Sequence, residues 1–308
     1  MSIDRVGTAA SAQLMLSQIQ KAEVALNHTN QQVVTGKIAS TYSGYGDKTA
    51  VMEAARSASA HAEANVSAAQ NASSRLDLQD TQLSQLEAIA DQVRQTLTKA
   101  SADQDATSLM NQMQGYFDQA SEVLNAKDSG GYIFGGDNNQ TPPVKVGSLA
   151  ALAALGSPAA AFDNGTMKAS VRVGDSQTVQ VGVLASDIGT QLFALFQQVA
   201  QFDAGNTFDT KTNAAQQSFL ESTIQTASDI GEDINQQSAS NGINYQMVQN
   251  TMTRLTATSN VYKGFVSNIQ DVDMPTALSQ LSQNQIALQA SFQVTSTLNK
   301  MSLLDFLN

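Results

Sequence analysis

The chain has 308 residues and a formal net charge of -11, and only 14% of its residues are charged. Its 16 basic residues are scattered, which excludes nucleic-acid binding through a clustered basic surface. It contains no cysteine, so disulfides, thiolate chemistry and sulfur-ligated metals are excluded together. With 6% aromatic residues and no tryptophan, the composition favours thin helix-helix seams over one thick globular core.

The first residues lack the basic segment, apolar core and cleavage site of a secretory signal. The longest apolar run, Leu149 to Leu155, is far too short to cross a bilayer. We therefore expect neither a cleaved signal peptide nor membrane insertion. This pattern is typical of a cytoplasmic protein, and it is equally compatible with export by a machine that reads an uncleaved N-terminus.

An apolar stripe at helical spacing runs through the first forty residues. Leu16, Ile19, Leu26 and Val33 form the stripe, and Gly36 ends it. The pattern predicts an amphipathic helix at the N-terminus.

The segment from residue 75 to residue 100 carries apolar residues at heptad spacing on two neighbouring seams. Such a sustained pattern predicts a long helix that packs along a partner helix. We expect this helix to begin after Asp47 as its N-cap and to end near residue 102, and a second helix to run from Asp103 to about Ala126. The seam residues are Leu76, Leu83, Ala90 and Leu97 with Leu86, Val93 and Ala100.

Residues 130–143 read GGYIFGGDNNQTPP and interrupt the helical pattern with glycine and proline. Gly131 and Gly136 could suggest a phosphate-binding loop. However, Asp137 stands where such a loop requires lysine, and no strand followed by a helix surrounds it. We therefore predict that these glycines turn the backbone, and we expect no nucleotide site.

A β hairpin is predicted in the middle of the chain. Residues 167–185 alternate apolar and polar side chains on both sides of the turn signal Gly174-Asp175-Ser176. An amphipathic helix is expected from about Asp187 to Gln201. We place the β-rich insert at residues 139–190, with the glycine-proline stretch as its entrance.

The C-terminal part of the chain repeats the heptad pattern. Residues 213–272 are predicted to be helical, with Gly231 and Gly242 as points where the helix can bend. A last helix follows Pro275. The seam residues are Val248, Leu255, Tyr262 and Ile269 with Met252 and Val266, and then Leu278, Leu281, Leu288 and Phe292.

The residue types that carry chemistry form no recognisable site. His28 and His61 lie in separate predicted helices, and neither has the spacing of a metal motif. Asp271 and Asp273 stand just before Pro275 and are better explained as a turn and N-cap than as a cation site. The sequence therefore predicts no catalytic, cofactor or metal site, and we expect a protein that is not an enzyme.

These patterns together predict a mainly α fold. We expect an elongated antiparallel bundle of long, coiled-coil-like helices formed by both chain ends, with a small β-rich insert in the middle. The predicted division is a terminal helical assembly domain (1–42 with 274–308), a helical rod domain (43–138 with 191–273) and the outer insert (139–190).

The apolar stripes on the terminal helices predict assembly between subunits. Each Å² of apolar surface left in water costs about 25 cal/mol. Because pairing of two isolated helices would be marginal in a single molecule, we expect sister molecules to cover the stripes. The predicted assembly residues are Ile3, Val6, Leu14, Leu16, Ile19, Leu26, Val33, Leu278, Leu281, Leu288, Phe292, Leu298, Leu303, Leu304 and Phe306.

Three segments resemble a known family. VVTGKIASTYSGYGDKTAVMEAARS at residues 33–57 is similar to the segment that joins terminal and rod helices in bacterial flagellins and their relatives. GGYIFGGDNNQTPPV at 130–144 resembles more narrowly the turn of flagellar hook-filament junction proteins (the FlgL family), and residues 271–308 resemble the ending of that family. The opening SIDRVGT and the loop TYSGYGD depart from the usual family pattern.

The resemblance implies a structural subunit that joins the flagellar hook to the filament. It would be exported through the flagellar type III channel without a cleaved signal and would act outside the cell. The implied partners are further copies of itself in a ring or helical homo-oligomer, the neighbouring hook-associated protein, flagellin and an export chaperone. The alternatives are flagellin itself and, from another class, a signalling coiled coil such as a chemoreceptor hairpin, which the predicted β hairpin contradicts.

Overall fold

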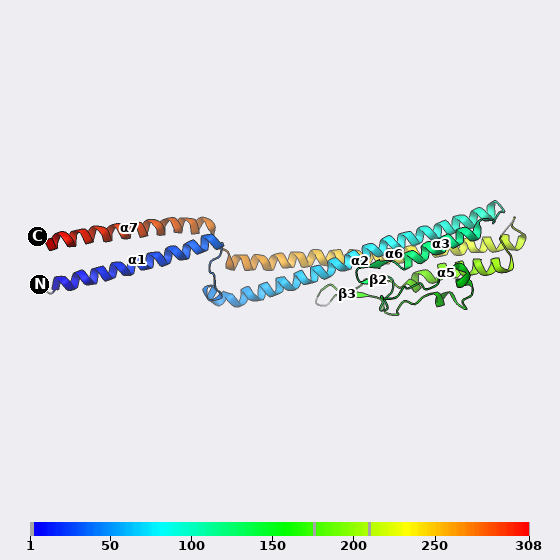
Figure 1. The fold of residues 1–308 in the computed structure, drawn as a ribbon, viewed down its shortest axis with the longest axis horizontal. Helices are drawn as coiled ribbons and strands as arrows, with labels where there is room; N and C mark the ends of the chain where they lie inside the picture. Colours follow the sequence, from blue (N-terminus) through cyan, green and yellow to red (C-terminus); the bar gives the residue numbers. More distant parts are fainter. Residues whose placement is uncertain (1–2, 175–176, 209–210, 308) are drawn as a thin grey trace. The chain divides into compact units, whose positions relative to one another are not determined.

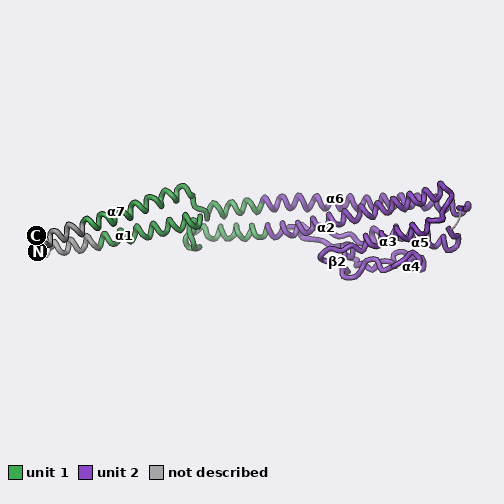
Figure 2. The backbone as a smooth tube through the Cα atoms, turned by 45° about the horizontal axis from the view of Figure 1, so that its top comes forward, with its two compact units in different colours: residues 1–61, 258–308 green, residues 62–257 purple. Residues whose placement is uncertain are grey.

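The computed structural model describes residues 3–174, 177–208 and 211–307. The chain forms two compact units, the first made of residues 1–61 and 258–308 and the second of residues 62–257 (Figure 2). Helices predominate, and the described strands form two small two-stranded sheets. The fold is thus mainly α with a small β insert, as predicted. The predicted division into three domains, whose boundaries differ from those of these two units, stays a prediction.

In the first unit, α1 (Ile3–Thr35) and α7 (Met274–Leu307) lie side by side (Figure 1). Gly36 ends α1 with a φ of +68°, a left-handed conformation that glycine adopts without strain. Asp273 stands directly before α7, and its carboxylate accepts a hydrogen bond from the Thr276 hydroxyl at 3.0 Å. The predicted turn and cap before the last helix are confirmed.

The two longest helices are α2 (Thr49–Ala102) and α6 (Ala214–Gln270). Helix α6 continues without a break through Gly231 and Gly242, so the predicted range is confirmed. Helix α2 begins slightly later than predicted, because Asp47 lies inside a short 3-10 helix, η1 (Tyr42–Lys48). Its predicted end near residue 102 is confirmed.

The heptad seam predicted for residues 75–100 is the buried face of α2. On the facing helix α6, the predicted seam residue Val248 is fully buried, and Leu255, Tyr262 and Ile269 are half-buried. Both helices therefore bury a narrow stripe of small and aliphatic side chains, as their composition indicated. The buried seam residues of α2 are Leu76, Leu83, Leu86, Ala90, Val93, Leu97 and Ala100.

The helix predicted to start at Asp103 starts later, and this prediction is wrong by several residues: α3 spans Leu109–Leu124. Gln104 has a φ of 53°, so the chain leaves the helical conformation there. The Asp105 carboxylate accepts hydrogen bonds from the Thr107 amide at 2.9 Å and the Thr107 hydroxyl at 2.7 Å. These bonds, the hydroxyl first, hold the pKa of Asp105 below its ordinary value and stabilise a turn instead of a helix start.

One of the two small sheets lies in the predicted insert, and the other lies just before it. Strands β1 (Lys127–Asp128) and β2 (Gly131–Tyr132) pair antiparallel, and so do β3 (Ser170–Arg172) and β4 (Thr178–Gln180). Val171 lies opposite Val179, which confirms the predicted hairpin. Of its predicted turn, residues 175–176 lie outside the described residues.

Three further helices complete the insert and its exit. Helix α5 (Ala185–Gly205) contains the predicted amphipathic helix and extends it at both ends. The short helices α4 (Leu149–Ala153) and η2 (Pro158–Ala161) precede the hairpin. Phe117 of α3 packs against Phe193 of α5 with ring centroids 5.2 Å apart, and both are fully buried. Both rings belong to the larger of the two hydrophobic clusters in the described part of the chain.

The glycine-rich stretch folds into a tight turn around buried side chains. Gly131 has a φ of +122° and Gly136 a φ of +62°. A Cβ atom at Gly131 would lie 2.4 Å from the Asn139 carbonyl oxygen, so a side chain is excluded there. Between the two glycines, Ile133 and Phe134 are fully buried. The predicted backbone-turning role is confirmed.

Asp137, the residue after this turn, joins the turn to the segment that precedes the hairpin. The Asp137 carboxylate accepts a hydrogen bond from the Met167 amide at 2.9 Å. That bond, followed by bonds from the backbone amides of Asp137 and Thr166, holds the pKa of Asp137 below its ordinary value. The Asp137 carboxylate therefore helps to hold this turn against the segment that precedes β3.

The β3–β4 hairpin packs against both long helices of the second unit. The Gln79 side chain of α2, fully buried, donates a hydrogen bond to the Val181 carbonyl at 2.8 Å. The Gln177 side chain accepts a hydrogen bond from the Thr251 hydroxyl of α6 at 3.1 Å. The apolar contacts join Val173, Val179 and Val181 of the hairpin with Ala69, Ala72 and Leu76 of α2 and Val248 of α6.

Candidate functional site

The terminal helices α1 and α7 pair along one seam. Half-buried or buried residues recur on each helix at alternating steps of three and four, which is the spacing of an antiparallel heptad seam. The apolar seam residues are Met15, Ile19, Ala22, Leu26 and Val33 of α1 and Ala277, Leu281 and Leu288 of α7.

One polar pair interrupts this seam. The Asn284 amide of α7 donates a hydrogen bond to the Thr29 hydroxyl of α1 at 2.9 Å. Thr29, only 4% exposed, in turn donates to the Ala25 carbonyl at 2.9 Å. A slip of one helix along the other would leave these groups unpaired in an apolar setting, so the pair fixes the register.

A second set of apolar side chains lies on the outer faces of the two helices. Each is at least half exposed, and Val34 reaches 77%. A surface of this kind on paired helices is typical of a protein-protein contact. The set consists of Leu14, Leu16, Val24 and Val34 of α1 and Leu278, Ile286, Phe292 and Val294 of α7. We call it the outer apolar face.

The structure therefore divides the predicted assembly residues into three groups. Ile19, Leu26, Val33, Leu281 and Leu288 lie half-buried in the seam within one chain, because antiparallel pairing places the two stripes opposite each other. That sister molecules also cover them stays a prediction. Leu14, Leu16, Leu278 and Phe292 belong to the outer apolar face, whereas the side chains of Ile3, Val6, Leu298, Leu303, Leu304 and Phe306 lie outside the described residues.

Four members of the outer apolar face were missed by the sequence reasoning. Val24, Val34, Ile286 and Val294 do not fall on the heptad stripe that the sequence makes obvious. The available signal was the presence of apolar residues off the heptad stripe of each terminal helix, where a solvated helix carries polar ones.

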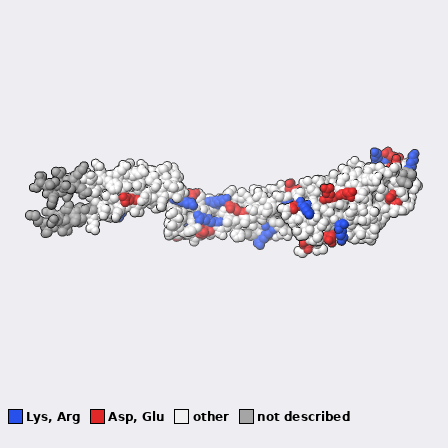
Figure 3. All heavy atoms as spheres, in the orientation of Figure 1, with Lys and Arg blue, Asp and Glu red and all other residues white. Residues whose placement is uncertain are grey.

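The outer apolar face carries almost no formal charge. Residues 274–297 contain no Asp, Glu, Lys or Arg, and residues 13–35 contain only Lys21 and Glu23. In Figure 3, α1 and α7 are mostly white, while red and blue atoms gather over other elements. Such a surface can be buried without the desolvation cost of charged groups.

The charge of the whole chain is divided unevenly between the two units. The residues of the first unit include seven basic and seven acidic side chains, and those of the second unit include nine basic and twenty acidic ones. The net charge of -11 therefore belongs to the second unit, and the first unit is neutral.

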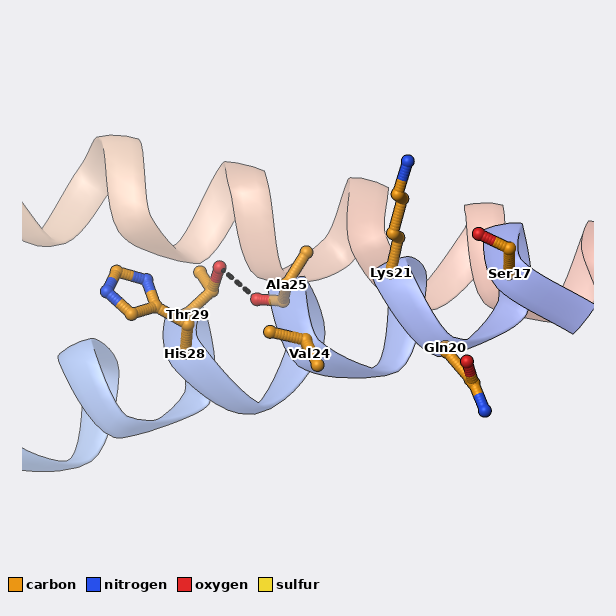
Figure 4. A pocket seen from close by; sticks show the side chains of 7 residues that line it. All are labelled: Ser17, Gln20, Lys21, Val24, Ala25, His28 and Thr29. Carbon is orange, nitrogen blue, oxygen red and sulfur yellow. Dashed lines mark hydrogen bonds between the residues drawn. The ribbon is translucent and has the colours of Figure 1, made fainter.

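A shallow groove of about 560 Å³ runs along α1 within this surface (Figure 4). His28 lies at one end of it and is exposed, as is His61 of α2, so both histidines occupy the surface. In the described part of the chain, no three metal-ligating side chains come together. The groove offers contact area and hydrogen-bonding groups; its lining is Ser17, Gln20, Lys21, Val24, Ala25, His28 and Thr29.

Pairing of the two terminal helices, with exposed apolar side chains and few charges, defines a class of long-helix proteins whose chain ends lie together. Comparison with known families makes this specific. The bacterial flagellin N-terminal helical region matches residues 6–139, and the bacterial flagellin C-terminal helical region matches residues 224–307. Together these matches cover more than half of the chain, which belongs to the flagellin family.

Solved structures show the same fold. A structure described as that of a flagellar hook-associated protein from Vibrio parahaemolyticus aligns with a TM-score of 0.60 at 14% identity, covering 72% of this chain and 97% of that one. FlgL from Bacillus cereus aligns with a TM-score of 0.54 at 12% identity, covering 70% of this chain and 98% of that one. The fold is therefore FlgL-like.

Two other comparisons add less. No curated protein matches the sequence significantly. Across the described residues, none of the helices combines the length and hydropathy that a membrane span requires.

Proposed function

We propose that this protein is a structural subunit of the bacterial flagellum that joins the hook to the filament and performs no catalysis. The observation that carries the proposal is the outer apolar face on α1 and α7, which the chain itself leaves uncovered. Burying exposed apolar side chains is favourable by about 25 cal/mol per Å², so this face favours contact with further copies of the chain.

The division of charge supports the same arrangement. A neutral, nearly uncharged first unit can be packed against copies of itself without repulsion. The acidic second unit would repel its copies at close range and is better kept in contact with solvent. Assembly through the terminal helices, with the insert facing outward, satisfies both conditions.

The place at the junction is supported by the extent of the structural likeness. The alignments span 97% of the hook-associated protein and 98% of FlgL, and 72% and 70% of this chain. The flagellin family matches leave residues 140–223 unmatched and are expected for a junction protein and for flagellin alike. Flagellin, the filament subunit, is therefore the second candidate.

The remaining roles follow from this assignment and belong to the same proposal. The protein acts outside the cell, after export without a cleaved signal peptide and in the company of an export chaperone. In the flagellum, it contacts its own copies, a neighbouring hook-associated protein and flagellin. It needs no cofactor and binds no nucleic acid.

Labelling distinguishes the two candidates. Because the chain has no cysteine, Ala160→Cys at an exposed position of the insert gives a single thiol for a maleimide dye. On isolated hook-filament structures, we expect a narrow labelled band where the hook ends. Continuous label along the filament would select flagellin, and label in neither place would overturn the flagellar assignment. The unsubstituted chain is the control for non-specific dye.

A further inference from the structure

The first unit contains two places where the chain turns between a terminal helix and a long helix. We call residues 36–48 the first crossover and residues 270–273, beginning with the last residue of α6, the second crossover. The two crossovers are joined by an antiparallel bridge between Lys37 and Asp271. The Ile38 amide donates to the Gln270 carbonyl at 2.8 Å, and the Val272 amide donates to the Gly36 carbonyl at 2.9 Å.

Little apolar packing holds the first crossover in place. None of the residues of η1 is buried. Gly46 has a φ of 57° and a ψ of -130°, a combination that is nearly restricted to glycine. The crossover therefore depends on hydrogen bonds, such as the one that the Tyr45 hydroxyl donates to the Ala39 carbonyl at 2.6 Å.

Arg56 of α2 contacts both sides of this joint. One guanidinium nitrogen donates to the Tyr42 hydroxyl of the first crossover at 3.1 Å. The other nitrogen donates to the side-chain oxygen of Gln270, the last residue of α6 and only 7% exposed. The guanidinium also lies 5.8 Å from the ring centroid of Tyr42. A planar group with a fork of donors can serve both acceptors at once, which a lysine ammonium on a flexible stem does less well.

We propose that Arg56 is the latch of a conformational joint in the first unit, holding the two crossovers together so that they open and close as one. Without the guanidinium, the buried Gln270 oxygen loses its charged donor, and an unsatisfied buried acceptor is costly. The crossovers are then held by the backbone bridge alone and separate more often. This device does not depend on the flagellar role proposed above.

Hydrogen exchange on the full chain tests the latch. In Arg56→Gln, we expect the Ile38 and Val272 amides to exchange about tenfold faster. A tenfold change in the opening equilibrium corresponds to about 1.4 kcal/mol. Arg94→Gln is the matched control, since Arg94 makes the same kind of i,i+3 ion pair with Asp91 as Arg56 makes with Glu53. We expect no change at either amide in that control.

A second variant is expected to stabilise the closed joint. Gln270→Glu offers Arg56 a charged acceptor, so the same two amides should exchange more slowly than in the natural chain. This variant also carries the test if Arg56→Gln loses its helical circular dichroism. Equal exchange in Arg56→Gln and Arg94→Gln, or faster exchange in Gln270→Glu, would overturn the latch.

Discussion

At the scale of single residues, the glycine turn before the insert shows a tight steric requirement. Gly131 combines a positive φ with a backbone oxygen at 2.4 Å from the place of a missing Cβ. Neither the Asn139 carbonyl nor the buried Ile133 and Phe134 beside the turn can give way easily. The requirement for glycine is therefore steric as well as conformational.

We expect Gly131→Ala to lower the free energy of unfolding of the second unit by about 2–4 kcal/mol, because strained φ and a backbone clash act together. Gly147→Ala is the control, since no atom lies within 4 Å of its Cβ position and its φ is not in the left-handed region. Chemical denaturation followed by circular dichroism gives both values. A loss below about 0.5 kcal/mol at Gly131 would contradict the steric argument.

At the scale of elements, the two faces of α7 predict two different effects. Leu288 lies in the seam with α1, while Ile286 is 63% exposed on the outer apolar face. We expect Leu288→Ser to loosen the terminal pair already in the isolated chain, with a loss of about 1–3 kcal/mol measured by hydrogen exchange of α1 amides. Ile286→Ser should leave that exchange unchanged and reduce self-assembly instead, measured by sedimentation.

The same pair of variants can contradict the assignment of the faces. If Ile286→Ser assembled as well as the natural chain, the outer apolar face would not be the assembly surface. If Leu288→Ser left the α1 amides protected, the seam within one chain would not be needed for pairing.

Much of the element structure was predictable because heptad spacing is a local property of the sequence. The range of α6, the seam of α2 and the β3–β4 hairpin followed from periods of 3.5 and 2. The late start of α3 was not predictable, since no glycine or proline marks the left-handed Gln104. That position depends on the turn that Asp105 and Thr107 form by hydrogen bonding.

The candidate site was only partly predictable, because periodicity shows that a stripe needs a partner and does not say which one. The stripes of α1 and α7 cover each other, so the exposed side chains are largely those off the stripe. The register pair Thr29 and Asn284 joins residues distant in sequence by a hydrogen bond between polar side chains. The buried Gln79 likewise gives no sign in the sequence that it faces the hairpin.

At the scale of the whole molecule, the uneven charge predicts how assembly depends on salt. The first unit is neutral and the second carries the net charge of -11, so repulsion opposes association while apolar contact favours it. Because the Debye length falls from about 10 Å at 0.1 M to about 3 Å at 1 M, salt weakens the repulsion and leaves the apolar term. We expect polymerisation, followed by light scattering, to become stronger as salt rises.

Variants that neutralise acidic residues of the second unit test whether charge repulsion causes this salt dependence. Glu232→Gln with Asp233→Asn removes two exposed charges from α6 and should make polymerisation less dependent on salt. Neutralising Lys21 and Glu23 together leaves the net charge unchanged and is the matched control. Polymers that dissolve as salt rises would show that ion pairs hold the copies together.

The hairpin between the two long helices has a mechanical consequence for the second unit. Its valines touch α2 and α6 at once, and the two residues that flank β4 are bonded to different helices, Val181 to Gln79 of α2 and Gln177 to Thr251 of α6. Sliding of one helix past the other would therefore pull on the two ends of one strand and disturb the valine cluster. We expect the hairpin to act as a cross-brace, so that resistance to such sliding depends on three elements and not on two.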